Sequence, residues 1–306
     1  MKKTFLQGRS LRAAAAAVAV ACAAGLAATP ALAREGVQVG EQSILTRLVP
    51  AEQLEAAASQ QFTQMATQAR QQNALLPDNH PQVVRVRAIA KRIIPFSLDW
   101  NKRASQWQWQ VMVLNSKELN AFCMPGGKIA FYTGILDQLQ LTDDEVAMVM
   151  GHEIAHALRE HARERIGKQT GVRLGASLIS SVLGLGNVGD TLLNYGGQLL
   201  TLKFSREDES EADLVGMELA ARAGYDPRAG VSLWKKMAAA AKGAPPQWLS
   251  THPSGSTRIR DIEANLPQVM PLYDKAPKPD QRFDPGRKVG DAYLQMEPLA
   301  YWGVAR

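Results

Sequence analysis

Cysteine is scarce in this sequence. The 306 residues contain only Cys22 and Cys123, too few for a disulfide framework or a four-thiolate metal site. Long uncharged apolar runs are also missing beyond the N-terminus, so no membrane-spanning helix is visible in the main part of the chain. Hydrophobic residues nevertheless make up 46% of the chain, which is enough for a packed core and excludes a wholly disordered protein.

The excess of positive charge lies mostly at the N-terminus. The formal net charge is +6, and residues 1–33 carry four positive charges and no negative one. These residues are typical of a secretory signal, with a basic start, an alanine-rich stretch and a small-residue cleavage site at Ala31-Leu32-Ala33. Residues 34–306 then carry +2, which is not the charge of a nucleic-acid-binding protein. We therefore expect export of the protein and no nucleic-acid partner.

Cys22 provides an alternative to simple export. The run Ala19-Val20-Ala21-Cys22 resembles a lipobox, which would leave a lipid anchor on Cys22 and make the protein an outer-membrane lipoprotein. Cleavage after Ala33 is favoured, because apolar residues continue past Cys22. Cys123 is then the single cysteine of the mature chain, and we expect it to be a small buried residue in a strand.

The pattern of apolar residues predicts a mostly helical α+β protein with three regions after the signal. Residues 34–79 are expected to form an N-terminal arm and a helix. Residues 80–266 form the main domain, and residues 267–306 are expected to be a proline-rich tail.

Three short strands are expected ahead of a long helix. The strands comprise residues 107–114, 119–124 and 128–133. Pro125-Gly126-Gly127 is the turn between the last two. The helix begins at a capping box formed by Thr142 and Glu145, and Gly167 is its expected end. Residues 171–200 are expected to form paired short helices, since polar residues interrupt their apolar ones.

The expected long helix carries His152, Glu153 and His156. Four residues along an α-helix advance about 6 Å and turn about 400°, so the two imidazoles leave the same face one turn apart. Both can therefore bind one zinc ion. Glu153 is rotated off this line, where it can act as a general base on a water instead of binding the metal.

A catalytic zinc needs a third protein ligand and one open position. His161 lies five residues after His156, about 140° around a continuous helix, and is interpreted as a packing or hydrogen-bonding residue. Glu209 and Asp213 lie four residues apart on a helix that Ser205 is expected to cap. One of these carboxylates can bind zinc, while the other accepts the free N–H of a ligating imidazole.

Several ordered motifs resemble one family of zinc metallopeptidases. They lie between about residues 80 and 265 and comprise Asn120-Ala121-Phe122, Pro125-Gly126-Gly127, Ile129, Thr133-Gly134, His152 to His156, His161, Ser205-Arg206, Glu209 to Asp213, Gly216, Thr251-His252-Pro253, Arg258 and Ile259. The family includes the integral-membrane CAAX prenyl proteases, the HtpX heat-shock protease, the mitochondrial Oma-type proteases and their soluble periplasmic relatives. The resemblance is to the soluble branch, and it implies a zincin-like metalloprotease domain with a small β-sheet ahead of the metal-binding helix.

The resemblance implies a role for each matching residue at the metal. One zinc ion per chain would be bound by His152, His156 and Glu209, with Asp213 supporting a ligating imidazole. Glu153 would activate the water.

The resemblance also implies residues around the cleft. His252 and Arg258 would sit across it, where they would stabilise the oxyanion or shield the metal. The strand of residues 128–132 would be an edge strand on which an extended peptide adds by backbone hydrogen bonds. The substrate-binding residues expected here are Asn120, Gly127, Lys128, Ile129 and Ala130.

Two functions are consistent with these features. The first is a periplasmic zinc endopeptidase that hydrolyses unfolded or misassembled envelope proteins, including outer-membrane proteins. The second is a chaperone-like envelope assembly factor whose zinc site is structural, or capped by His252 as a fourth ligand.

Overall fold

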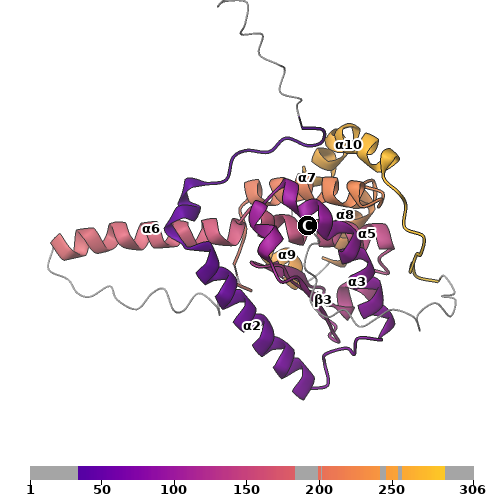
Figure 1. Cartoon of the computed structure of the whole chain (residues 1–306), viewed down its shortest axis with the longest axis horizontal. Coiled ribbons are helices and arrows are strands. Elements are labelled where there is room, and N and C mark those ends of the chain that lie inside the picture. The colour runs from indigo at the N-terminus through magenta and orange to yellow at the C-terminus, as the bar shows by residue number, and fades with distance from the viewer. Residues whose placement is uncertain (1–33, 183–198, 201, 242–245, 254–256, 287–306) are drawn as a thin grey trace, which may run out of the picture. The chain divides into compact units, whose positions relative to one another are not determined.

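The computed structural model describes residues 34–182, 199–200, 202–241, 246–253 and 257–286. The expected signal peptide with Cys22 and the last part of the expected tail, residues 287–306, lie outside these ranges. The described residues form a mostly helical α+β protein with one small sheet, as the sequence predicts (Figure 1). None of the helices in these ranges is long and apolar enough to cross a membrane.

Three strands, nine α-helices and three 3-10 helices are present in the described ranges. The strands are β1 (Gln110–Leu114), β2 (Ala121–Met124) and β3 (Lys128–Tyr132). The α-helices are α2 (Ala51–Gln71), α3 (Pro81–Ile93), α4 (Thr133–Asp137), α5 (Asp143–Leu158), α6 (His161–Val182), α7 (Arg206–Arg222), α8 (Ala229–Ala240), α9 (Gln247–Thr251) and α10 (Arg258–Lys275). The 3-10 helices are η1 (Ile44–Leu48), η2 (Ile94–Asp99) and η3 (Lys102–Gln106).

The sheet has the order β1-β3-β2, so β3 is its central strand. β3 pairs in parallel with β1, where Val111 faces Ile129, and antiparallel with β2, where Cys123 faces Ile129. The expectation that residues 128–132 form an edge strand is therefore wrong. The hairpin to β2 was visible in the sequence, but the parallel pairing with β1 joins segments that are far apart along the chain.

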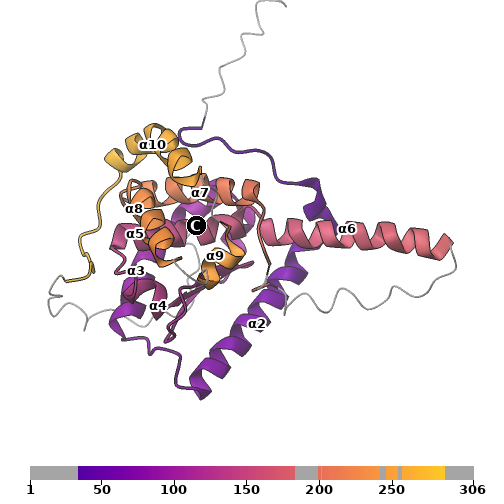
Figure 2. The same cartoon turned by 180° about the vertical axis from the view of Figure 1, so that it is seen from behind.

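Helix α5 begins as predicted, and all of its residues except Asp144 are buried. The side chain of Thr142 accepts the N–H of Glu145, and the side chain of Glu145 accepts the N–H of Thr142, which completes the capping box. The helix packs between strand β2 and helix α7. Figures 1 and 2 both show α5 and α7 side by side.

Helices α5 and α7 cross at two glycines. A Cβ atom on Gly151 would lie 2.5 Å from the carbonyl oxygen of Gly216, and one on Gly216 would lie 2.5 Å from the backbone nitrogen of His152. Neither site has room for a side chain, so the two backbones touch directly. This close approach brings α7 to the face of α5 that carries the histidines.

The long helix expected to end at Gly167 is interrupted. α5 ends at Leu158, Glu160 adopts a positive φ of 59°, and α6 begins at His161. A glutamate gives no signal for such a break, because glycine or asparagine is the usual residue there. Gly167 instead allows close packing, since a Cβ on it would lie 2.1 Å from the carbonyl oxygen of Leu45.

Helix α6 continues without a break to Val182 and extends away from the core in both views (Figures 1 and 2). The expected pair of short helices is therefore wrong for residues 171–182. Residues 183–198 lie outside the described ranges.

Helix α10 extends past the expected start of the tail. It runs through Pro267 and Pro271 and ends at Lys275. The next residues, 276–286, are called the strap here.

The strap reaches the first turn of α5. The side chain of Asp284 accepts the N–H of Asp143 (2.7 Å), and the N–H of Phe283 is donated to the Asp143 carboxylate (2.5 Å). Arg282 forms an ion pair with Asp144. The strap therefore supplies hydrogen-bond partners to the start of the helix that carries the histidines.

Candidate metal centre

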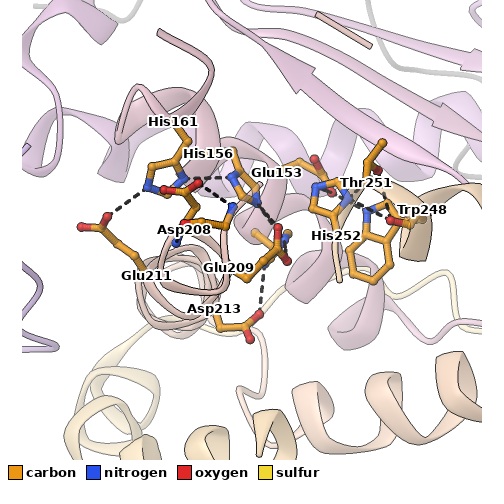
Figure 3. Close-up of polar contacts among 12 residues, drawn as sticks. Glu153, His156, His161, Asp208, Glu209, Glu211, Asp213, Trp248, Thr251 and His252 are labelled. Atoms are coloured by element: carbon orange, nitrogen blue, oxygen red, sulfur yellow. Dashed lines mark hydrogen bonds and ion pairs between the residues drawn. The ribbon is translucent and has the colours of Figure 1, made fainter. Parts of the chain in front are cut away.

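Four buried side chains of metal-ligand type meet beside α5. The candidate ligand atoms of His152, His156, Glu209 and His252 all lie within 4.8 Å of one another. α5 supplies two of them one turn apart, α7 supplies Glu209, and His252 follows α9. Figure 3 shows His156, Glu209 and His252 pointing toward one another. No member exposes more than 3% of its surface.

The two helical imidazoles turn their ε-nitrogens toward one another and toward Glu209. The Nε2 atoms of His152 and His156 are 3.0 Å apart. Glu209 places Oε1 3.4 Å from the Nε2 of His156 and Oε2 3.5 Å from that of His152. Within the described part of the chain, Glu209 Oε1 and His252 Nε2 have no hydrogen-bond partner.

His152 is supported by a carboxylate and a guanidinium. Its Nδ1 lies 3.0 Å from Asp213 Oδ1, which also accepts from Arg258 Nη2 at 2.7 Å. Burial would raise the pKa of Asp213, but the charge of Arg258 and the hydrogen bond from His152 hold it below its usual value. Asp213 therefore accepts the Nδ1 proton of His152 and leaves the Nε2 lone pair for a cation.

Arg258 does not lie across a cleft from the ligands. It sits behind them, donating from Nη1 to Glu209 Oε2 at 2.7 Å and from Nε and Nη2 to Asp213. Its guanidinium also stacks 3.7 Å from the Trp234 ring centroid. Two buried carboxylates attract the guanidinium to this side, so Arg258 binds the candidate ligand Glu209 and Asp213, which supports His152.

His156 is supported by another imidazole. The Nδ1 atoms of His156 and His161 are 2.9 Å apart, and His161 Nε2 lies 2.9 Å from Glu211 (Figure 3). Glu211 pairs with Arg159 at 2.6 Å. His161 is a hydrogen-bonding residue, although it begins α6 and is not on the helix that carries His156. No role for Glu211 was predicted from the sequence.

The residues present suit a zinc ion. Burial lowers the pKa of His152 to about 4 and holds that of His156 well below its usual value, so both imidazoles are neutral at pH 7. With both Nε2 atoms deprotonated, two lone pairs 3.0 Å apart would face one another, an arrangement that a bound cation stabilises. Burial raises the pKa of Glu209 to about 8 against the opposing charge of Arg258, and another cation would keep it ionised. Two imidazoles and a carboxylate form a known catalytic zinc donor set.

Glu153 lies beside this cluster and does not join it. Its Oε1 accepts the indole N–H of Trp248 at 2.6 Å and lies 3.6 Å from His252 Nε2. Burial raises the pKa of Glu153 well above its usual range, while the hydrogen bonds from Trp248 and the backbone of Cys123 oppose this. The carboxylate is therefore fixed next to the unpaired ligand atoms, where a general base belongs.

Comparison with known protein families shows which family the chain belongs to. The family model described as "Peptidase family M48" matches residues 82–266, more than half of the chain and all four members of the cluster. The chain belongs to peptidase family M48.

Curated relatives agree with the M48 assignment. The chain is 38% identical over 199 residues to the mitochondrial metalloendopeptidase OMA1 of Schizosaccharomyces pombe, which covers 64% of this chain and 56% of that protein. It is 29% identical over 163 residues to the metalloprotease LoiP of Escherichia coli, covering 50% of this chain and 61% of LoiP. The beta-barrel assembly-enhancing protease of Yersinia pestis is 26% identical over 202 residues, with 62% of this chain and 41% of the relative covered. The chain thus matches about half the length of these relatives.

Four of the five expected substrate-binding residues do not line the cavity at the metal centre. Lys128, Ile129 and Ala130 are buried in the central strand, and Lys128 donates to the backbone oxygen of Gln108. At Gly127 a Cβ would collide with the ring of Trp109 at 2.6 Å, which places this residue against the core. Because both edges of β3 are paired, residues 128–130 have no free backbone edge for a peptide, and the substrate contacts expected at these positions and at Gly127 stay a prediction.

Strand β2 lies at the metal centre instead. Asn120 to Pro125 line a cavity of about 50 Å³ together with Glu153, His156 and His252. Phe204 also lines it, with its ring stacked 4.0 Å from that of His156 and its N–H donated to the Thr251 carbonyl. Of the expected substrate-binding residues, only Asn120 borders this cavity. Phe204 and Trp248 were missed, because an isolated aromatic residue has no motif that signals its place in the fold.

Proposed function

We propose that this M48 chain is a zinc endopeptidase. The observation that carries the proposal is the buried cluster with unpaired ligand atoms on Glu209 and His252, with Glu153 held beside it. His152, His156 and Glu209 would hold the ion. When bound, zinc would polarise the scissile carbonyl and lower the pKa of the attacking water.

The protein's own residues would move the protons. Glu153 would take a proton from the attacking water and deliver it to the leaving amine, because its carboxylate is fixed beside the cluster by Trp248. The Nε2 atom of His252 has no partner among the described residues and faces the same region. Because His252 Nδ1 donates to the carbonyl of Trp248, Nε2 would donate an N–H only in the imidazolium form, which would stabilise negative charge on the carbonyl oxygen of the substrate.

An extended substrate would add to strand β2. Asn120 accepts the N–H of Tyr132, so the antiparallel register directs the backbone groups of Ala121 and Cys123 away from β3. The outward N–H of Cys123 is donated to Glu153, so a substrate would pair with the groups of Ala121 and with the carbonyl of Cys123. Cleavage would then occur in a peptide that continues the sheet.

We propose envelope proteins of a Gram-negative periplasm as the substrates. The proposal is supported by the predicted signal at residues 1–33 and by the similarity to a protease named for enhancing β-barrel assembly. Unfolded or misassembled proteins present the extended segments that β2 would accept.

The activity is tested by Glu153→Gln. The variant should keep about one zinc per chain, because Glu153 is not a ligand, while casein cleavage falls by about 10²–10⁴-fold. Glu263→Gln, an exposed change on α10, is the matched control and should cleave like the wild type. Wild-type cleavage rates in the Glu153→Gln variant would show that the base is wrongly assigned.

A second candidate is the chaperone-like assembly factor with a capped zinc site. The inclusion of His252 in the ligand cluster favours it, because a fourth protein ligand would close the open position. Zinc content and casein cleavage in His252→Ala separate the candidates. A wild type that does not cleave, together with a variant that does, supports the cap. A wild type that cleaves, together with a variant that does not, supports the catalytic role of His252.

A further inference from the structure

Among the described residues, Trp248 donates a side-chain hydrogen bond to Glu153. Its indole Nε1 lies 2.6 Å from Glu153 Oε1, and Figure 3 shows the ring next to His252. The residue is fully buried. A buried indole N–H needs an acceptor, and Glu153 is the acceptor that this one has.

Three contacts hold the indole in place. Its ring stacks on that of Trp234, with centroids 5.2 Å apart, and on that of His252, with centroids 5.0 Å apart. Its backbone N–H is donated to the carbonyl of Leu119 at 3.2 Å, which ties α9 to the residues just before β2. The indole is therefore held between two rings and cannot turn away from Glu153 without disturbing both.

We propose that Trp248 is a positioning residue that holds Glu153 in place for its role as general base. The inference rests on the proposed endopeptidase function. His252 Nε2 lies 3.6 Å from the same oxygen that Trp248 holds. Without the indole N–H, Glu153 Oε1 would lose the side-chain donor that fixes it, and the backbone of Cys123 would be left to orient the carboxylate. The carboxylate would then be free to turn away from the attacking water.

The test compares two tryptophans that each donate to a carboxylate. Trp248→Phe removes the donor at Glu153 and leaves an aromatic ring for the stack. Trp107→Phe is the matched control, because Trp107 Nε1 donates to Glu55 Oε1 at 2.9 Å and not to Glu153. We expect Trp248→Phe to lower kcat on a fluorogenic peptide about 10- to 100-fold with KM changed less than about twofold. The control should retain kcat within about twofold.

An isosteric replacement separates positioning from packing. Benzothienylalanine at position 248 replaces only the N–H of the indole by sulfur, so it preserves the volume and the stacking. We expect its kcat to fall as far as that of Trp248→Phe, while its zinc content and melting temperature stay at the wild-type values. A replacement with the wild-type kcat overturns the inference, as does a loss in which KM rises while kcat is unchanged.

The positioning role of Trp248 and the proposed endopeptidase function can fail separately. If the wild-type protein loaded with zinc does not cleave peptides, the endopeptidase proposal fails and Trp248 has no base to position. If the wild type cleaves and both changes at position 248 leave kcat intact, only the role of Trp248 is wrong.

Discussion

The two ends of helix α5 both bury charged side chains, but they differ in how completely these are paired. At the first turn, Asp143 accepts from Arg85 at 2.8 Å and from the strap at 2.5 Å. Glu145 accepts from Lys236 at 2.6 Å and from Ser232 at 2.7 Å. At the other end, Glu209 Oε1 has no hydrogen-bond partner within the described ranges, although Arg258 binds its second oxygen.

The difference indicates which end is structural and which is functional. Buried polar atoms in folded proteins are almost always hydrogen-bonded, so a fully paired cluster is the ordinary result of folding. An unpaired carboxylate oxygen next to neutral imidazoles has a desolvation cost that folding leaves uncompensated. A bound cation removes that cost, and the same region of the protein therefore gains stability from its ligand.

The largest difference in zinc affinity is expected between variants of one acidic residue at each end of α5. Glu209→Gln should weaken zinc binding by at least about 100-fold, because it removes a charged ligand. Glu145→Gln, at the paired end, should leave the zinc affinity unchanged while lowering the stability of α5. Competition with a fluorescent zinc chelator measures both. Equal zinc affinities in the two variants would contradict the division between the two ends.

Arginine removal should give similar losses of stability and different losses of metal binding. Arg258 lies beside Glu209 and Asp213, and Arg85 beside Asp143, with both guanidiniums buried. Replacing either by glutamine leaves a buried carboxylate without its cation, which should lower the free energy of unfolding by about 3–5 kcal/mol. Urea denaturation of the zinc-free proteins measures this loss.

The zinc affinity should then differ between the two arginine variants. Arg258→Gln should also weaken zinc binding by about 10- to 100-fold, since Glu209 and Asp213 lose the donors that orient them. Arg85→Gln should not. An unchanged zinc affinity in Arg258→Gln would show that the guanidinium is only a stabilising partner of Asp213.

The smallest effect is expected at the strap. Asp284→Ala removes the side-chain acceptor for the N–H of Asp143, so it should cost about 1 kcal/mol of unfolding free energy, as loss of a helix N-cap does. The kcat should be unchanged, since the strap touches only the paired end of α5. Asp280→Ala, an exposed change on the same strap, is the control. A fall in kcat at unchanged stability would mean that the strap acts on the metal centre.

Local spacing in the sequence was enough to predict part of the centre. His152 and His156 share a helix face because four residues make about one turn, and the capping box at Thr142 identified the start of that helix. Glu209 entered through the family resemblance, since spacing alone left it equivalent to Asp213. The structure separates the two: Glu209 faces both ε-nitrogens, while Asp213 faces His152 Nδ1.

The remaining features depend on contacts between distant segments. The position of β3 in the sheet is set by its parallel pairing with β1, and no local pattern reports that pairing. Arg258 lies behind the ligands because two carboxylates of α7 attract it, although its motif places it near the centre. The helix break at Glu160 escaped prediction because glutamate rarely adopts a positive φ.

The glycine crossing of α5 and α7 has a consequence for which cations the centre accepts. Gly151 and Gly216 bring backbone atoms into contact, so no side chain between the helices can rotate or compress to change their spacing. The spacing of the two helix backbones at this crossing is therefore set by backbone van der Waals radii, and it limits how far the carboxylate of α7 can lie from the imidazoles of α5. A ligand cage of fixed size discriminates among ions by radius and preferred geometry. With a metal bound, two residues without side chains would thus contribute to metal selectivity alongside the ligands themselves.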